Sequence, residues 1–518
     1  MINKSNFLIK STICFLFVFA SSYYLLENNY EYEFSTKIIL LFLYLIIFFV
    51  ITFGIYKAKT NDNLPIFILT NIYFFLCYIL FFFSDKSLIF PDLNDIELIY
   101  ALKIFSYGYI ALSLGYFISR NVFKNIYRKE FKFLNASSNE FFIIGSFCLF
   151  INLIVFEIFN INKYFSGLSQ LRYVFIIIGI SLLTEYLFIC LKNKDSILKI
   201  FLSCILIFFS LFSFILSAAL SYPFMIMFLI IVYYSYRAKK IYIYPLLIAA
   251  ILFFFLHMGK YNYRNLIQTT FSVQESGTGK VYLITRGNQK NILQKTKDII
   301  NSQIQVFLKQ DYVKKYTHCN NINDYDSELG VNFVYDLSNC KIVVNYQLER
   351  RIFHSMESLV IVTKLTPNDV PYWDGYSYLI LKSKIVPRIF WKDKPNDRLG
   401  NEFGQRYNVL HKGYEDLGTI RDDYTSWNMP LLNELYVNYG KKGVIYGMFV
   451  LGLIFSLITK IFTISNHQNM EKAISFFIFM PIFFLESHAS LIFGALIQTY
   501  LAAIILLFIL LKVLRKFY

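Results

Sequence analysis

Residues 491–511 read LIFGALIQTYLAAIILLFILL and contain no charged side chain. About 20 such residues, coiled as a helix, are enough to cross the hydrocarbon core of a membrane. Lys512, Arg515 and Lys516 follow directly, and cations of this kind are retained on the cytoplasmic flanks of membrane spans. The stretch therefore predicts a membrane-spanning helix with its carboxyl end in the cytoplasm.

The composition of the whole chain agrees with this prediction. Of the 518 residues, 56% are hydrophobic and only 16% are charged, and the mean hydropathy is +0.49. A soluble domain carries about 25% charged residues. The composition therefore disfavours a soluble enzyme, a disordered protein and a nucleic-acid-binding factor. The net charge of +16 does not indicate a nucleic-acid partner, because the cations follow a membrane pattern; the expected partner is the lipid bilayer.

Similar apolar stretches recur along the chain and predict an all-α polytopic membrane protein with about twelve transmembrane helices. They lie at 7–26, 38–56, 66–83, 99–118, 141–159, 173–191, 198–216, 219–236, 241–258, 443–462, 473–489 and 491–511. The first could also be a signal peptide. No clear small-residue cleavage site follows it, however, and its removal would spoil the even number of spans.

Lys and Arg collect in alternate loops between these spans, at 57–59, 120–132, 192–194 and 237–240. The positive-inside rule places these loops and both termini in the cytoplasm. The predicted domains are an N-terminal bundle of about nine spans, a large extracytoplasmic loop domain and about three C-terminal spans, at 1–258, 259–442 and 443–518.

Two cysteines, Cys319 and Cys340, lie in the predicted outer loop. Outside the cytoplasm such a pair can oxidise, and a disulfide closing a loop of this length would contribute about 3 kcal/mol. The alternative is two unrelated free thiols.

No cofactor or metal site is expected, because the six histidines are scattered and there is no phosphate-binding glycine loop or dinucleotide motif. Glu185 is the one acid expected deep in a span. An intramembrane acid is a functional candidate, although a buried hydrogen bond would also explain it.

Two segments of the outer loop could carry chemistry. The first is KIVPRIFWKDKP at 384–395, in which Arg388, Lys392 and Lys394 could hold a pyrophosphate while Trp391 stacks on a sugar. The alternative is an interfacial segment that binds anionic lipid headgroups.

The second segment is a predicted helix in which Arg350, His354 and Glu357 share a polar face. An Arg that holds phosphate beside a His or Glu that accepts a proton would suit a transferase. An ordinary amphipathic surface helix gives the same pattern.

Several motifs between 350 and 450 occur in a recognisable order. They are Arg351, Thr366-Pro367, Gly375-Tyr376-Ser377-Tyr378, PRIFWKDKP at 387–395 and NELYVNYGKKGV at 433–444. This region resembles the O-antigen polymerase (Wzy) family of inner-membrane oligosaccharide repeat-unit polymerases, and Tyr263-Arg264 at the start of the loop is also similar. One departure is the segment at 218–223, where members of that family often have an Arg and this chain has none.

The resemblance implies a polytopic glycosyltransferase of the lipid-phosphosugar type, with its large loop in the periplasm. It would polymerise glycans carried on undecaprenyl pyrophosphate into an O-antigen of lipopolysaccharide or a capsule-like polysaccharide, without a metal. A flippase and a chain-length regulator are the partners that the family implies.

The resemblance also suggests roles for particular residues. Arg264, Arg388 and Lys394 would bind the pyrophosphate, with Arg350 or Arg351 as a further contact. Glu434 is the first candidate for the catalytic base or for the residue that orients it, and His354 is the second. Alternatively, Glu434 is a helix-end carboxylate that orders the loop.

Two other functions stay open. An O-antigen ligase would share the topology and the chemistry but transfer the glycan to lipid A-core. A flippase or transporter of lipid-linked sugars would instead have short loops and internal repeats, which the long segment at 259–442 disfavours.

Overall fold

The computed structural model describes residues 39–43, 45–47, 64–79, 81, 95–122, 131–159, 169–193, 197–216, 221–239, 242–258, 271–276, 279–284, 292–308, 344–384, 386, 391, 399–407, 428–462, 469–494 and 496–517. Helices dominate these residues. In the first half of the chain they are α3 (Ile66–Phe74), η1 (Phe75–Ile79), α5 (Asp95–Val122), η3 (Lys132–Leu134), α6 (Ser138–Ile151), η4 (Asn152–Ile158), α7 (Ser169–Asn193), α8 (Ile197–Leu216), α9 (Ser221–Arg237) and α10 (Ile243–Met258).

The second half begins with a hairpin of two antiparallel strands, β1 (Phe271–Ser276) and β2 (Gly279–Ile284), in which Phe271 pairs with Ile284. The helices that follow are α12 (Ile292–Leu308), α13 (Val344–Leu365), α14 (Tyr376–Lys384), α15 (Leu399–Arg406), α16 (Leu431–Ile461), α17 (Met470–Phe479), η8 (Met480–Phe483), α18 (Ala489–Ile492) and α19 (Leu496–Phe517).

Six helical stretches of the described residues are long and apolar enough to cross a membrane. They are Ile96–Arg120, Ser138–Phe156, Leu171–Cys190, Ile197–Ile215, Leu431–Ile461 and Ala489–Phe517. Each overlaps a predicted span, and shorter apolar helices occupy two more, at Ile66–Ile79 and Tyr244–Phe253. The prediction of a helical membrane protein is confirmed at this level, whereas the span at 7–26 lies outside the described residues.

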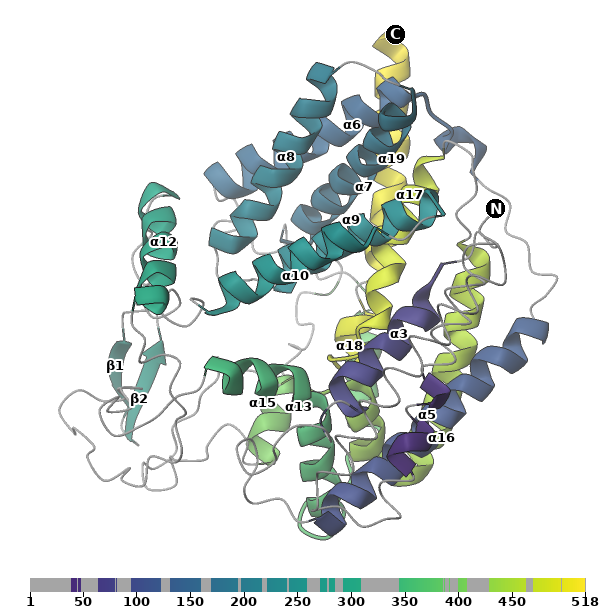
Figure 1. The fold of residues 1–518 in the computed structure, drawn as a ribbon, viewed down its shortest axis with the longest axis vertical. Coiled ribbons are helices and arrows are strands. Elements are labelled where there is room, and N and C mark those ends of the chain that lie inside the picture. The colour runs from purple at the N-terminus through teal and green to yellow at the C-terminus, as the bar shows by residue number, and fades with distance from the viewer. Residues whose placement is uncertain are drawn as a thin grey trace.

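The helices form two groups (Figure 1). In one group α7 packs against α6, α8, α17 and α19, and in the other α5 runs along α16 while both contact α13. Contacts of α14 with α18 and of α3 with η8 join the two groups. The hairpin and α12 lie to one side of both groups (Figure 1).

Glycines allow α5 and α16 to approach closely. A Cβ added at Gly115 would lie 2.1 Å from the carbonyl oxygen of Phe449, and one added at Gly452 would lie 2.2 Å from that of Leu112. Small residues have this role at helix interfaces in membranes, because they let two backbones meet. The close contact between the two backbones therefore fixes the position of α16 relative to α5.

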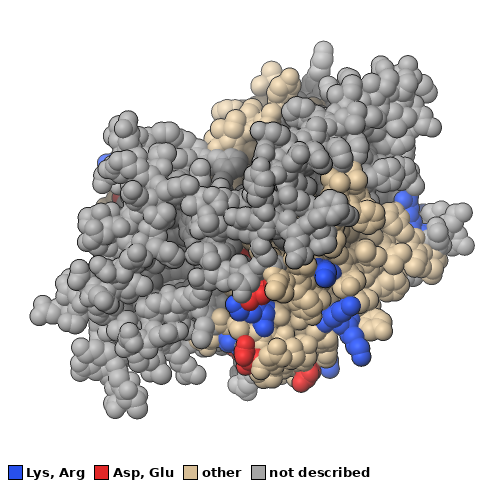
Figure 2. Space-filling model, turned by 60° about the horizontal axis from the view of Figure 1, so that its bottom comes forward, with Lys and Arg blue, Asp and Glu red and all other residues tan. Residues whose placement is uncertain are grey.

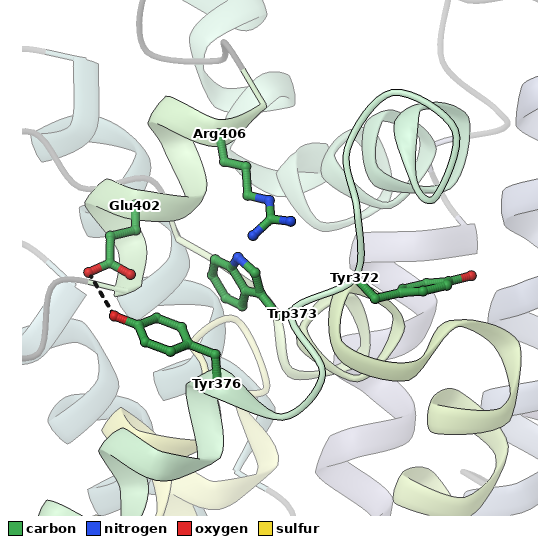
Figure 3. Close-up of a pocket in the computed structure, with 5 residues that line it drawn as sticks. All are labelled: Tyr372, Trp373, Tyr376, Glu402 and Arg406. Carbon is green, nitrogen blue, oxygen red and sulfur yellow. Dashed lines mark hydrogen bonds between the residues drawn. The ribbon is translucent and has the colours of Figure 1, made fainter.

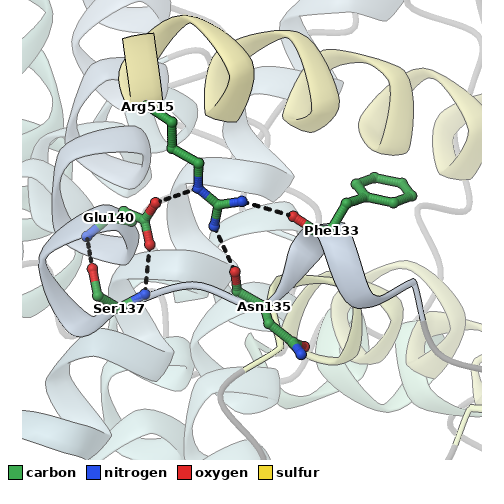
Figure 4. A network of polar contacts seen from close by, with 5 residues as sticks. All are labelled: Phe133, Asn135, Ser137, Glu140 and Arg515. Carbon is green, nitrogen blue, oxygen red and sulfur yellow. Dashed lines mark hydrogen bonds and ion pairs between the residues drawn. The ribbon is translucent and has the colours of Figure 1, made fainter. Parts of the chain in front are cut away.

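The end of α19 is held by Arg515 (Figure 4). Its Nε donates to Glu140 Oε1 at 2.7 Å, and its two terminal nitrogens donate to the carbonyls of Phe133 and Asn135. Glu140 also completes a capping box with Ser137 at the start of α6. One guanidinium thus joins the end of α19 to the beginning of α6.

Glu185 of α7 is buried in an ion pair. Its Oε1 lies 2.5 Å from the terminal nitrogen of Arg237, at the end of α9, and its other oxygen accepts a hydrogen bond from Tyr233. The guanidinium carbon of Arg237 also lies 5.0 Å from the ring centre of Phe188. These contacts give Glu185 a structural role between α7 and α9.

Candidate functional site

The region that carries the sequence motifs is built on the first turns of α16. This helix begins at Leu431, before the predicted span at 443–462, and it is interrupted at Tyr439 and Gly440. Gly440 has φ 60° and ψ −151°, a conformation that strains residues with a Cβ. The first turns are therefore a separate helical piece, set at an angle to the apolar part that follows.

Glu434 lies inside this piece with no exposed surface. Its Oε2 accepts a hydrogen bond of 2.6 Å from the backbone N–H of Ala489, at the start of α18. The backbone N–H of Leu431 similarly donates to the carbonyl of Leu485 at 3.1 Å. In this geometry Glu434 orders the segment that precedes α18, and a catalytic role for it stays a prediction.

His354 lies in α13, which packs against α5, η1 and α16. Its Nε2 is 2.8 Å from the carbonyl oxygen of Asn428, and the side-chain nitrogen of Asn428 donates to Glu486 Oε1 at 2.9 Å. His354 is only 8% exposed and Glu357 only 3%. Their burial differs from the solvated polar face expected of a surface helix.

Asn433 ties α16 to α13. Its Nδ2 donates to Ser358 Oγ at 2.6 Å, and the neighbouring Ser355 Oγ lies 2.9 Å from the hydroxyl of Tyr73 in α3. All these groups are buried. Buried polar groups that satisfy one another fix one relative arrangement of the helices, because each loses its partner if they shift.

The later residues of the same motif hold the segment between α13 and α14. The carbonyl of Val437 accepts the N–H of Trp373 at 3.0 Å. Asn438 Oδ1 accepts the N–H of Gly375 at 3.0 Å, and its Nδ2 donates to Ser377 Oγ at 2.9 Å. The motif at 433–440 therefore positions both α13 and the segment at 366–377.

This segment forms one wall of a pocket of about 410 Å³ (Figure 3). The lining residues are Tyr372, Trp373, Tyr376, Glu402 and Arg406. The side chains of the last four face one another, whereas the ring of Tyr372 extends the other way. Figure 2, which brings the lower end of the molecule in Figure 1 forward, shows basic and acidic side chains interspersed on this end.

The polar groups of the pocket are fixed by neighbours. The hydroxyl of Tyr376 donates to Glu402 Oε1 at 3.4 Å, and burial together with this carboxylate raises the pKa of Tyr376. Arg406 donates to the carbonyl of Pro371, and its guanidinium carbon lies 5.6 Å from the ring centre of Trp373. The pocket thus combines a protonated phenol, a carboxylate and a guanidinium with aromatic surface.

The structure brings only some of the predicted site residues together. Glu434 and His354 lie on neighbouring helices, and Trp391 is 41% exposed. Arg350 and Arg351 belong to α13, but the structure does not describe their side chains. The predicted residues that lie outside the described part of the chain are Arg264, Arg388, Lys392, Lys394, Cys319 and Cys340.

Sequence reasoning missed the pocket. Tyr376 lies in the motif at 375–378, but the pattern there predicts no role for its side chain, and Arg406 lies in none of the motifs. Within the described residues, no group of three or more His, Cys, Asp or Glu side chains is arranged to hold a metal ion. Comparison with protein families, with curated proteins and with solved structures finds no match for the chain.

Proposed function

We propose that the chain polymerises undecaprenyl-pyrophosphate-linked repeat units into a surface polysaccharide by metal-independent glycosyl transfer. The observation that carries the proposal is the position of the motif at 433–440, the most extended part of the resemblance to the Wzy family. Its side chains anchor α13, the segment at 366–377 and the start of α18 at one end of an apolar helix. An amphiphilic substrate needs such a junction between a polar site and apolar helices.

The proposed topology has about twelve spans in a bacterial inner membrane, both termini in the cytoplasm and residues 259–442 in the periplasm. The six apolar stretches support a membrane location. The basic residues near the ends of α5, α16 and α19, Arg120, Lys460 and Arg515, support the orientation, because cations collect on the cytoplasmic side. A flippase and a chain-length regulator would work with the enzyme.

In the proposed reaction, the acceptor hydroxyl oxygen forms a bond to the anomeric carbon of the donor glycan. The bond from that carbon to the pyrophosphate oxygen breaks, and the pyrophosphate leaves with the electron pair. Arg264, Arg388 and Lys394 would neutralise the leaving group, with Arg350 or Arg351 as a further contact. Glu434 or His354 would accept the hydroxyl proton or orient the group that does.

The experiment is a profile of surface polysaccharide in a host that lacks the gene. The wild-type chain and the Lys297→Ala variant, which removes an exposed cation from α12, should both restore a ladder of long chains. The deletion and Arg388→Ala should leave single repeat units on the core. If long lipid-linked chains accumulate and none reach the core, the enzyme is a ligase. An unchanged profile would contradict both enzyme functions.

A further inference from the structure

The pocket between the segment at 371–376 and α15 contains groups that the proposed reaction does not use. We propose that it binds a pyranose ring of the lipid-linked glycan, uncharged or bearing an amino group, and that it excludes the pyrophosphate. The inference rests on the proposed function, because it takes the ligand to be part of that glycan.

The aromatic surface suits one face of a sugar ring. Tyr376 is 42% exposed, so its ring is available to a ligand, whereas Trp373 is 8% exposed and forms the floor. The two rings meet edge to face, with centres 5.9 Å apart and planes at 71°. Small-ligand sites combine apolar walls of this kind with a few placed polar groups, and a volume of about 410 Å³ lies within their usual range.

The polar groups suit the hydroxyls at the edge of such a ring. Glu402 offers carboxylate oxygens as acceptors, and Arg406 offers several N–H donors. Arg406 is already held by the carbonyl of Pro371 and by the face of Trp373, so little freedom is lost when a ligand binds. An acceptor and a donor one helical turn apart on α15 can hold neighbouring hydroxyls of one ring.

The charge of the pocket selects against phosphate. One carboxylate and one guanidinium balance each other, and the carboxylate of Glu402 would repel any phosphate that approached Arg406. A neutral or amino sugar meets no such penalty. The pyrophosphate must therefore bind elsewhere, which agrees with the separate cations predicted for it.

The pocket is also coupled to the motif of α16. The backbone N–H groups of Trp373 and Gly375 are held by Val437 and by Asn438. A sugar bound against Tyr376 would consequently sit at a fixed position relative to Glu434, one turn before Asn438 on the same helix.

The test is calorimetric binding to the purified full chain in detergent. The ligand is the reducing oligosaccharide released from the host's own lipid carrier by mild acid, and inorganic pyrophosphate is the competitor. Tyr376→Ala and Glu402→Gln should each weaken oligosaccharide binding about tenfold. The control Tyr244→Ala, which removes an 81% exposed tyrosine from α10, should bind as the wild type does.

Either of two outcomes would contradict sugar binding in this pocket. One is an unchanged oligosaccharide affinity in both Tyr376→Ala and Glu402→Gln. The other is displacement of the oligosaccharide by pyrophosphate. Glu402→Gln keeps the size of the side chain, so it tests the site even if Tyr376→Ala folds poorly. If the wild-type chain binds the oligosaccharide through this pocket while deletion of the gene leaves the polysaccharide length unchanged, the proposed function is contradicted but sugar binding in the pocket is not. If deletion abolishes the long polysaccharide chains but both variants bind the oligosaccharide normally, only sugar binding in the pocket is contradicted.

Discussion

Asn438 Oδ1 accepts a hydrogen bond of 3.0 Å from the backbone N–H of Gly375, which has φ 89°. The bond joins the first turns of α16 to a segment 63 residues earlier in the chain. Trp373 and Tyr376 lie on either side of Gly375, so this amide sets the position of the pocket wall.

Replacing Asn438 by Ala should shorten or abolish the long polysaccharide chains. It removes the partner of the half-buried backbone N–H of Gly375 and of the buried hydroxyl of Ser377, at a cost of about 1–3 kcal/mol in the free energy of unfolding. Ser377→Ala removes only the second contact of Asn438 and should have a smaller effect on both properties. Thermal unfolding and chain-length profiles measure the two effects. A larger loss in Ser377→Ala than in Asn438→Ala would contradict this role of Asn438.

Gly440→Ala should destabilise the kink in α16. The new methyl group would meet a positive φ and would lie 2.6 Å from the hydroxyl of Tyr372, so the cost is about 1–3 kcal/mol. Tyr372→Phe removes that hydroxyl, and the double variant should therefore recover part of the lost stability. The measurement is the unfolding temperature of the four purified proteins, and full recovery would mean that backbone strain contributes nothing.

Arg515→Gln should loosen the end of α19. The side chain of Arg515 is 44% exposed, so the loss of its ion pair with Glu140 and of its two carbonyl contacts should cost only about 1 kcal/mol. Lys516→Gln removes an adjacent exposed cation and serves as the matched control. Protease cleavage near the end of the chain should increase in Arg515→Gln alone, and equal cleavage in both variants would argue against the contact.

Glu185→Ala should be more damaging than any of these substitutions. It leaves the guanidinium of Arg237 buried without its carboxylate, at a cost of about 3–5 kcal/mol. The pair Glu185→Gln with Arg237→Met removes both charges and should recover much of the yield of folded protein in detergent. Equal yields of folded protein from Glu185→Ala and the wild-type chain would contradict this structural role.

Six of the predicted spans coincide with helices of sufficient length among the described residues, because an apolar helix in a membrane leaves a plain signal in the sequence. The observed stretch Ile197–Ile215 lies within one residue of the prediction at 198–216 at each end. The start of α16 was missed for a physical reason. Asn433, Glu434 and Asn438 lower the hydropathy there, yet all three are buried against other parts of the chain.

The pocket could not be predicted for a similar reason. Tyr376 and Arg406 line the same pocket although they are far apart in the sequence, and no local pattern encodes that proximity. The dipeptide Asp374-Gly375 is the available signal, because an Asp-Gly pair favours a tight turn. The burial of His354 likewise depends on α13 packing against three other elements.

The most direct test of the proposed function is reconstitution. The purified full chain would be placed in vesicles with the host's undecaprenyl-pyrophosphate-linked repeat unit and a metal chelator, and the glycans would be sized by mass spectrometry. The account predicts chains of two or more repeat units and one undecaprenyl pyrophosphate released for each new linkage. Repeat units that stay single with wild-type chain, under conditions in which the chain binds them, would contradict it.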